Sequence, residues 1–298
     1  MNVGVIGLDS SHAIQFSRRI NALNENAKTR CHVTHCWDAG PEPVAVRPDV
    51  KASQPTLQSL GIRLVGSLRD LLDQVHAVMV LNVDGRRHHE LAMAAIDRGL
   101  PVFVDKPLTC LSSDAIALLE CSQSRNARIY SASALRFSTP VPAVRLDAIG
   151  ELLTLDAFGP VEERPEMPGL WYYGCHSFEL VDSLWVGRAR TSRVRAEATY
   201  DRYMIEMEYA DGKSATIRLD RSGTGPFGAS IRGALGAVDI TADLSVSYDA
   251  LVLSIVRFFE GEPPTIPLRV IVESICTIEA CHASLAQSGT WVDVGSTA

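Results

Sequence analysis

The sequence lacks the features that place a protein in a membrane or on a nucleic acid. No uninterrupted apolar run reaches the ~20 residues that a membrane-spanning helix needs. There is no basic run, and the net charge of −7 disfavours nucleic acid and anionic membrane surfaces. We therefore expect no nucleic-acid partner and no membrane partner, but a small molecule or another protein.

We also expect neither a disulfide framework nor a signal peptide. Its seven cysteines include no C-x-x-C pair, and their odd number and scattered spacing fit reduced thiols. No basic segment precedes the first predicted strand, which already begins at Val3. These features predict a cytoplasmic protein. A length of 298 residues with 46% hydrophobic content allows two domains, each with its own core.

In the first half, short apolar runs alternate with amphipathic runs. This pattern predicts a Rossmann-type α/β domain over residues 1–132, with a doubly wound parallel sheet. The expected strands are Val3–Gly7, Val33–Trp37, Ala77–Leu81, Val102–Val104 and Ile129–Ser131. The expected helices are Ala13–Leu23, Leu68–Gln74, His88–Arg98, Asp114–Ser124 and Pro142–Ala148. Residues 40–58 are rich in proline and predict a loop.

The second half predicts an α+β domain over residues 133–298, with a large open, mostly antiparallel sheet. Its expected strands are Leu152–Phe158, Thr191–Thr199, Met204–Tyr209, Ser214–Leu219, Ala229–Gly233 and Ala237–Thr241. Asp211-Gly212 is a typical hairpin turn. Two amphipathic helices, Val246–Phe259 and Leu268–Ala286, are expected to follow. Because an open sheet face is commonly covered by a second subunit, we expect a homodimer or homotetramer.

The first predicted strand runs into G-L-D-S-S-H, where dinucleotide-binding folds carry G-x-G-x-x-G. Only Gly7 keeps its glycine, and Asp9 and His12 replace the others. A carboxylate ~5 Å from a phosphate repels it by roughly 3 kcal/mol at an effective dielectric of 20, unless Asp9 turns away as the N-cap of the next helix. Ser10, Ser11 and His12 remain candidate donors to a phosphate. Taken alone, this turn favours the absence of a dinucleotide.

Asp38 favours the opposite conclusion. It ends the second predicted strand, where an acid binds the ribose hydroxyls of NAD and repels the 2′-phosphate of NADP. A solvated acid at a strand end is the alternative. The nearby segment from Cys31 to Cys36 also holds two histidines, but alternate residues of a strand face opposite sides. Such ligands do not converge, so we predict no metal site there.

Three further segments carry candidate site residues. Asn82-Val83-Asp84 and His88 follow one buried strand, and Asp105-Lys106 follows the next; ligands bind at the carboxyl ends of parallel strands. A lysine whose pKa is lowered by burial exchanges protons with a substrate hydroxyl, and the alternative is a surface Lys–Asp pair. The aromatic-rich segment 169–179 places His176 and Glu179 on one helix face. A sugar site and ordinary core packing are equally open there.

Together these motifs resemble the Gfo/Idh/MocA oxidoreductases. That family reads T-P-x-x-x-H-x-E, then a helix, then a strand ending in E-K-P. Here His88 and Glu90 match, and Asp105-Lys106-Pro107 stands for E-K-P. Leu135-Arg136-Phe137 resembles the R-F after the sixth strand, and Gly174-Cys175-His176 with Glu179 resembles D-x-G-x-H-x-x-D. The altered phosphate turn and D-K-P mark a divergent branch, and Tyr172 stands where the family has a catalytic-site Asp.

The resemblance implies a dehydrogenase that transfers a hydride between NAD(P), with NAD preferred, and a carbinol of a sugar, polyol or related compound. It implies a cis Lys106–Pro107 bond. The predicted catalytic residues are Lys106, His176 and Tyr172. The predicted cofactor-binding residues are Gly7, Leu8, Asp9, Ser10, Ser11, His12, Asp38, Asn82, Val83, Asp84, His88 and Asp105. The predicted substrate-binding residues are Arg136, Tyr173 and Glu179, and no metal is predicted. Two alternatives stay open: a lyase, isomerase or hydrolase on the same scaffold, and a non-catalytic sugar-binding protein.

Overall fold

The computed structural model describes residues 1–39, 53–144, 146–187 and 189–295. The chain divides into two compact units. The first comprises Met1–Thr109, Ser113–Ala132 and Tyr248–Leu268, and the second comprises Cys110–Ser112, Ser133–Ser247 and Arg269–Ala298. The sequence predicts a boundary between residues 132 and 133. The structure differs in that the late segment Tyr248–Leu268 packs with the first unit.

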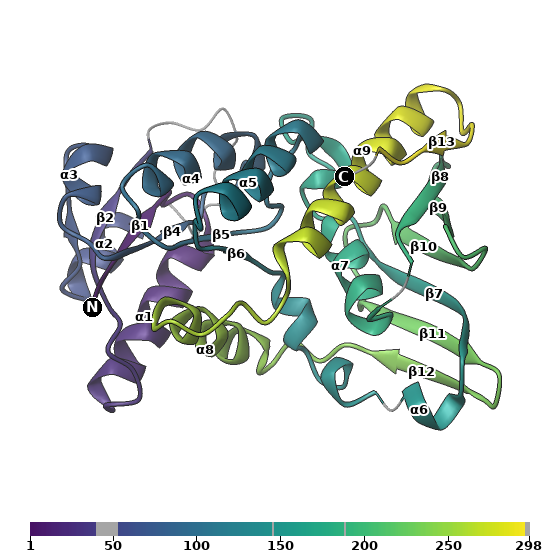
Figure 1. The fold of residues 1–298 in the computed structure, drawn as a ribbon, viewed down its shortest axis with the longest axis horizontal. Helices are drawn as coiled ribbons and strands as arrows, with labels where there is room; N and C mark the ends of the chain where they lie inside the picture. Colours follow the sequence, from purple (N-terminus) through teal and green to yellow (C-terminus); the bar gives the residue numbers. More distant parts are fainter. Residues whose placement is uncertain (40–52, 145, 188, 296–298) are drawn as a thin grey trace. The chain divides into compact units, whose positions relative to one another are not determined.

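The first unit is built on a six-stranded sheet, drawn with its helices in Figure 1. Its strands are β1 (Asn2–Ile6), β2 (His32–Trp37), β3 (Arg63–Leu64), β4 (Ala77–Val80), β5 (Val102–Val104) and β6 (Ile129–Ser131). They lie in the order β3-β2-β1-β4-β5-β6, and every neighbouring pair is parallel. This order confirms the predicted doubly wound Rossmann-type fold, with its topological switch point between β1 and β4.

Helices cover both faces of this sheet, which is why its central strands are continuously apolar. All residues of β4 and β5 are buried. The helices are α1 (Ser11–Glu25), α2 (Ser53–Ser59), α3 (Leu68–Leu72), α4 (His88–Ile96), α5 (Ser112–Ser124) and α8 (Ser247–Phe259). In Figure 1, α4 and α5 lie on one side of the sheet, and α1 with α8 lies on the other.

Two predictions about local structure were wrong. The predicted helix over 142–148 is instead a 3-10 turn, η4 (Val141–Ala143), and a short helix, α6 (Leu146–Ile149), with residue 145 outside the described residues. The chain leaves the helical conformation at Val144, which is extended with φ −63° and ψ 121°, so the two short segments do not join into one helix. The predicted loop over 40–58 gives way to α2 at Ser53, while residues 40–52 lie outside the described part of the chain.

The second unit holds a seven-stranded sheet in the order β12-β11-β7-β10-β9-β8-β13. Its strands are β7 (Leu152–Pro160), β8 (Thr191–Ala198), β9 (Arg202–Tyr209), β10 (Ser214–Asp220), β11 (Gly228–Gly233), β12 (Ala237–Thr241) and β13 (Val292–Asp293). The pairs are antiparallel except β7 with β10. A mostly antiparallel sheet is therefore confirmed. The hairpin between β9 and β10 turns at Gly212, whose φ is +82°.

One face of this second sheet is packed and the other is polar. Along β10, Ala215, Ile217 and Leu219 are buried while alternate residues are exposed or half-buried, as expected of a sheet with one wet face. Two helices, α7 (Cys175–Leu184) and α9 (Leu268–Ala286), belong to this unit's core. Across the described residues, no helix is both long and apolar enough to cross a membrane.

Candidate active site

The turn after β1 keeps its first glycine for a steric reason. Gly7 has a φ of +86°, a left-handed conformation that favours glycine. A Cβ at this position would lie 2.6 Å from the backbone nitrogen of Asn82, which follows β4. The ends of β1 and β4 therefore approach each other so closely that a side chain at Gly7 does not fit. Leu8 is buried, and Ser11 is the first residue of α1.

Asp9 turns toward the loop after β4. Its carboxylate oxygens accept from the backbone N–H of Val83 at 3.2 and 3.3 Å. The predicted N-cap role of Asp9 is wrong, because the extended residue at the N-cap is Ser10, whose hydroxyl donates to the carbonyl of Leu81 at 2.8 Å. The side chain of Ser10 makes no capping bond to the backbone of α1. The first N–H groups of a helix have no partner within the helix, and in doubly wound folds this end of the helix binds phosphate.

His12 lies at the third glycine position, and its ring hydrogen-bonds to two side chains of the first unit. Its Nδ1 is 2.5 Å from Oδ2 of Asp105, and its Nε2 is 3.0 Å from the hydroxyl of Tyr248. Its ring stacks on Phe16, with centroids 4.7 Å apart. Tyr248 belongs to α8, and no local pattern in the sequence indicates that it meets the phosphate turn.

Asp105 and Lys106 follow β5. The carboxylate of Asp105 is 4% exposed, and its Oδ1 accepts from the backbone N–H of Lys106 at 2.8 Å. Burial acts to raise the pKa of Asp105, but His12 and then Lys106 outweigh it and lower that pKa below its ordinary value. Lys106 is half-buried, and the Lys106–Pro107 peptide is cis, as the resemblance implied.

The loop after β4 is built from the predicted residues Asn82, Asp84 and His88, all of them buried. The ring of His88 lies between two carbonyl oxygens, with Nδ1 2.7 Å from Pro107 O and Nε2 2.8 Å from Asn82 O. Asp84 caps a 3-10 turn by accepting from the backbone N–H of Arg86 at 3.0 Å. Burial acts to raise the pKa of Asp84, but its bonds to Arg86 lower it overall. These side chains shape the loop, and their contact with a cofactor stays a prediction.

Asp38 lies directly after β2, at the same carboxyl edge of the sheet as the phosphate turn. Its Oδ2 accepts from the side-chain amide of Gln54 on α2 at 2.6 Å. This is the position from which an acid reaches the adenosine ribose in doubly wound folds. The first unit thus brings the phosphate turn, Asp38 and the loop of Lys106 to the carboxyl ends of β1, β2 and β5.

In the second unit, a serine connects two of the predicted site residues. The hydroxyl of Ser133 is 2.7 Å from Nδ1 of His176, and its backbone N–H donates to Oε2 of Glu179 at 2.7 Å. The predicted placement of His176 and Glu179 on one face of α7 is therefore confirmed. Ser133 was missed, although its position just after β6 marks a strand end where site residues gather.

Arg136 and Glu179, predicted to bind substrate, form a buried ion pair. Nε of Arg136 donates to Oε2 of Glu179 at 2.6 Å, and the two residues are 8% and 4% exposed. Asp182 adds a second carboxylate on the same arginine and also accepts from Ser274 on α9. The network supports the helix that carries His176. A direct contact of Arg136 or Glu179 with a substrate stays a prediction.

Aromatic rings surround His176. Tyr173 lies edge-on to it with centroids 5.2 Å apart, and Phe227, which the sequence patterns did not indicate, lies 5.6 Å away. Tyr172 is 7% exposed, with the guanidinium of Arg164 5.6 Å from its ring centroid. The rings around His176 are compatible with both interpretations of the aromatic segment, core packing and a sugar site. The catalytic role of Tyr172 stays a prediction.

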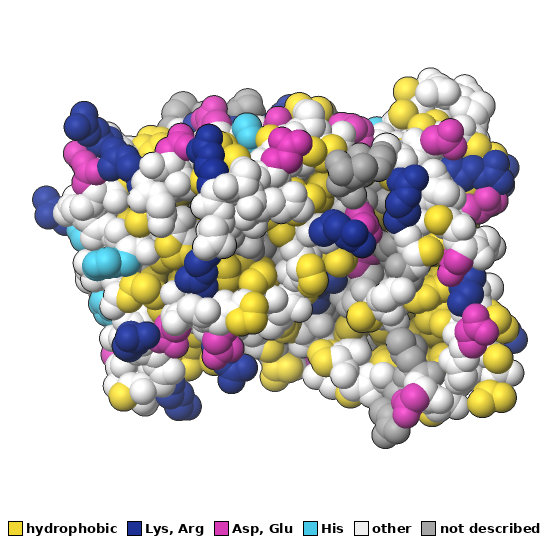
Figure 2. Space-filling model, in the orientation of Figure 1, with side chains coloured by type: hydrophobic (Ala, Val, Ile, Leu, Met, Phe, Trp, Pro, Cys, Tyr) yellow, Lys and Arg dark blue, Asp and Glu magenta, His cyan; other side chains and the backbone are white. Residues whose placement is uncertain are grey.

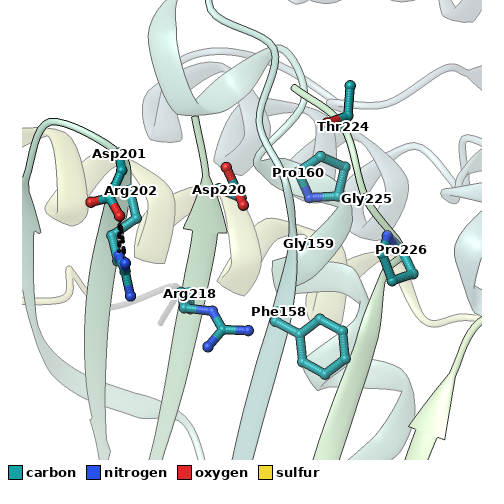
Figure 3. Close-up of a pocket in the computed structure, with 10 residues that line it drawn as sticks. All are labelled: Phe158, Gly159, Pro160, Asp201, Arg202, Arg218, Asp220, Thr224, Gly225 and Pro226. Carbon is teal, nitrogen blue, oxygen red and sulfur yellow. Dashed lines mark hydrogen bonds and ion pairs between the residues drawn. The ribbon is translucent and has the colours of Figure 1, made fainter. Parts of the chain in front are cut away.

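A separate cavity of about 330 Å³ lies on the open face of the second sheet. Figure 3 shows Arg218 extending toward Phe158, where its guanidinium lies 5.6 Å from the ring centroid, and Asp201 paired with Arg202. The remaining lining residues lie at the ends of β7 and β10 and on the loop before β11. The predicted site residues do not line this cavity, so we do not assign it as the active site.

Comparison with known families gives a match for the first part of the chain. Residues 1–133 match the GFO_IDH_MocA model, described as an oxidoreductase family with an NAD-binding Rossmann fold. This segment of the chain is therefore similar to the NAD-binding part of the Gfo/Idh/MocA oxidoreductases, in agreement with its motifs.

Individual relatives extend the comparison. "Inositol 2-dehydrogenase 4" of Saccharopolyspora erythraea is 28% identical over 148 residues, covering 47% of this chain and 38% of the relative. "Inositol 2-dehydrogenase" of Leifsonia xyli is 31% identical over 129 residues, covering 41% and 37%. The matched segment thus spans under two fifths of these relatives. The myo-inositol dehydrogenase from Lactobacillus casei, solved with NAD(H) and myo-inositol, has a TM-score of 0.81 at 15% identity over 99% of this chain and 97% of that one. This likeness shows a shared fold.

Proposed function

We propose that this chain is an NAD-dependent dehydrogenase that oxidises a CH–OH group of a sugar, polyol or related compound. The phosphate turn is the observation that carries the proposal. The carboxylate of Asp9, the residue whose charge disfavours a dinucleotide, accepts from the backbone N–H of Val83, and the side chain of Ser10 makes no capping bond to α1. A backbone end of this kind binds a pyrophosphate in doubly wound folds.

NAD is the proposed cofactor rather than NADP. Asp38 follows β2 at the ribose position, and its carboxylate would bind two ribose hydroxyls but repel a 2′-phosphate. The residues present therefore fit NAD. Gly7 allows the tight turn, the N-terminal amides of α1 would bind the pyrophosphate, and the carboxylate of Asp38 would accept from the ribose hydroxyls. The bound nicotinamide supplies the hydride acceptor of the reaction.

The proposed substrate is a polyhydroxylated compound, and inositol is the first candidate because two relatives carry it in their names. Oxidation of a carbinol removes a hydride from carbon and a proton from its oxygen. We assign the proton to Lys106 and His176, the lysine as acceptor and the histidine as a group that binds the hydroxyl or relays its proton. Tyr173 and Phe227 offer apolar ring surface beside His176, and Tyr172 is the proposed additional donor.

The test of this proposal is turnover with NAD and myo-inositol, followed as NADH absorbance. Lys106→Ala should lose at least about 100-fold in kcat, a loss typical for removal of one general acid–base group, and its dissociation constant for NADH should stay within about threefold. Lys213→Ala is the matched control, because Lys213 lies in the second unit, where it pairs with Glu151 at 2.8 Å. Equal turnover of Lys106→Ala and wild type would contradict the assigned role.

We also propose a homodimer or homotetramer formed through the second sheet, in the cytoplasm. Cross-strand ion pairs on its open face, such as Arg193 with Glu208 at 2.7 Å, share that face with the exposed side chain of Met204 on β9. In Figure 2, basic and acidic side chains are interspersed on the face in view, which supports a partner other than nucleic acid. All seven cysteines are free thiols, as a reducing compartment requires. Sizing chromatography that gives a monomer would contradict the assembly.

A further inference from the structure

One carboxylate joins the phosphate turn to the loop that carries Lys106. The two oxygens of Asp105 have different partners: Oδ2 lies 2.5 Å from Nδ1 of His12, and Oδ1 accepts from the backbone N–H of Lys106 at 2.8 Å. Asp105 is almost wholly buried, so solvent does not replace either contact. The position of the Lys106 backbone is thereby tied to the side chain of His12.

His12 is itself held from several directions. Its Nε2 lies 3.0 Å from the hydroxyl of Tyr248, and its ring stacks on Phe16. Phe16 in turn contacts the edge of Phe103, with centroids 6.3 Å apart. Phe103 is on β5, the strand that leads into Asp105 and Lys106. Stacking and two polar contacts therefore fix both the plane and the rotation of the imidazole.

The backbone after Lys106 is fixed as well. The carbonyl of Pro107 lies 2.7 Å from Nδ1 of the buried His88, whose Nε2 reaches the carbonyl of Asn82. Lys106 thus stands between two residues, Asp105 and Pro107, that are each held by a histidine from another element. The backbone on both sides of Lys106 is therefore held in place.

We propose that His12, acting through Asp105, is a positioning residue for Lys106, and that Tyr248 orients His12. This inference rests on the proposed function, in which Lys106 accepts the proton. It assigns the positioning of that lysine to His12, the residue at the third glycine position. Loss of the His12–Asp105 bond frees the carboxylate that holds the Lys106 backbone. A displacement of a reacting group by about 1 Å costs up to about 100-fold in rate.

The charged and titratable groups around this chain of contacts come from three segments. Asp105 and Lys106 follow β5, and Tyr248 and Asp249 begin α8. Arg19 of α1 lies with its guanidinium 5.6 Å from the ring centroid of Tyr248 and donates to Asp249 at 2.6 Å. The His12 variants of the experiment leave these neighbouring groups unchanged, so a difference in those variants comes from His12.

The experiment compares wild type, His12→Phe and His12→Asn. Phenylalanine keeps the stacking on Phe16 without a hydrogen bond, while asparagine keeps a donor for Asp105. His89→Asn on α4 is the matched control, because His89 only approaches Asp114 at 4.0 Å. The lysines, at positions 28, 51, 106 and 213, are labelled by reductive ¹³C-methylation, and the NMR signal of Lys106 is assigned with Lys106→Arg. Its titration is followed together with kcat for NAD and myo-inositol and the dissociation constant for NADH.

For His12→Phe we expect the titration midpoint of Lys106 to move by about half a pH unit or more. We expect kcat to fall at least about tenfold, with the dissociation constant for NADH within about threefold of wild type. His12→Asn should recover part of both changes, and His89→Asn should change neither. Tyr248→Phe should show a smaller change in the same direction.

Two results would overturn the inference. The first is a His12→Phe protein whose Lys106 titration and kcat match wild type. The second is a loss of NADH affinity without a change at Lys106, which would make His12 a phosphate ligand instead. If His12→Phe does not fold, His12→Asn and Tyr248→Phe decide in its place. If wild type binds no dinucleotide, the proposed function fails, but the Lys106 titration still decides whether His12 positions that lysine.

Discussion

At the scale of single residues, Gly7 shows how one missing side chain shapes the site. Its φ is +86°, and an added Cβ would lie only 2.6 Å from the Asn82 nitrogen, so the position has room for glycine alone. Gly7→Ala combines left-handed strain with overpacking, and we therefore expect a loss of about 2–5 kcal/mol in unfolding free energy. Urea unfolding measures this loss.

The matched control for this substitution is Gly99→Ala. Gly99 has a similar φ of +70°, but a Cβ there would meet no atom within 4 Å. It should lose only about 1–2 kcal/mol, the strain alone. Equal losses at the two positions would show that the close approach of Asn82 is not what restricts Gly7.

The lowered pKa of Asp105 predicts how the stability of the fold depends on pH. Its pKa is lowered in the folded chain because His12 and Lys106 outweigh burial. A carboxyl group of this kind stabilises the fold above its unfolded pKa of about 4 and loses that contribution as the pH falls through its folded value. The wild type should therefore lose more stability than Asp105→Asn below about pH 4, as measured by urea unfolding at several pH values.

Asp249→Asn is the comparison for that measurement. Asp249 pairs with Arg19 at 2.6 Å, but its side chain is 69% exposed, and surface ion pairs contribute little to stability. The stability of Asp249→Asn should therefore decrease with falling pH in the same way as that of the wild type. If the stability of Asp105→Asn falls with pH as steeply as that of the wild type, Asp105 is not the group that causes the acid dependence.

Sequence patterns predict some site residues well and others not at all, for a physical reason. Asp38 and Lys106 are predictable because the ends of parallel strands meet at one edge, so local patterns locate them. Tyr248 lies 236 residues from its partner His12, and only tertiary packing joins such distant segments. For the same reason, no local pattern indicates that Arg136 and Glu179 are paired and buried.

At the scale of elements, α8 completes the first unit from far along the chain. Phe258 is buried against Tyr130 of β6, with centroids 5.4 Å apart, and the guanidinium of Arg128 lies 4.7 Å from its ring centroid. Tyr130 also bonds to Ser254 on the same helix at 2.9 Å. The strand patterns revealed most elements of the sheet, but periodicity alone does not say against which sheet a helix packs.

Phe258→Ala tests this docking. Removal of a fully buried phenyl ring should lower the unfolding free energy by about 3–5 kcal/mol. Amide exchange should speed up in β5 and β6, next to the emptied site. Leu253→Ala on the same helix is the control, because Leu253 is 36% exposed and its loss should cost less than about 1 kcal/mol. Unchanged exchange in β6 of the Phe258 variant would contradict the docking.

At the scale of the whole molecule, the fold class was predictable because both halves carry strong patterns. Alternating strands and helices indicate a parallel sheet, and alternating polarity indicates a sheet with one wet face. The parallel pairing of β7 with β10 was not predictable, because β8 and β9 follow β7 in sequence while β10 lies beside it. Substrate choice depends on the shape of a site, which the sequence patterns do not encode.

The central claim is that this altered phosphate turn still holds NAD. Titration of the purified protein with NAD, NADH, NADP and NADPH, followed by calorimetry, tests it most directly. We predict micromolar or tighter binding of NADH and weaker binding of NADPH, because Asp38 repels a 2′-phosphate. Absence of binding of all four at millimolar concentration would contradict the account, and would leave a non-redox enzyme or a sugar-binding protein on the same fold.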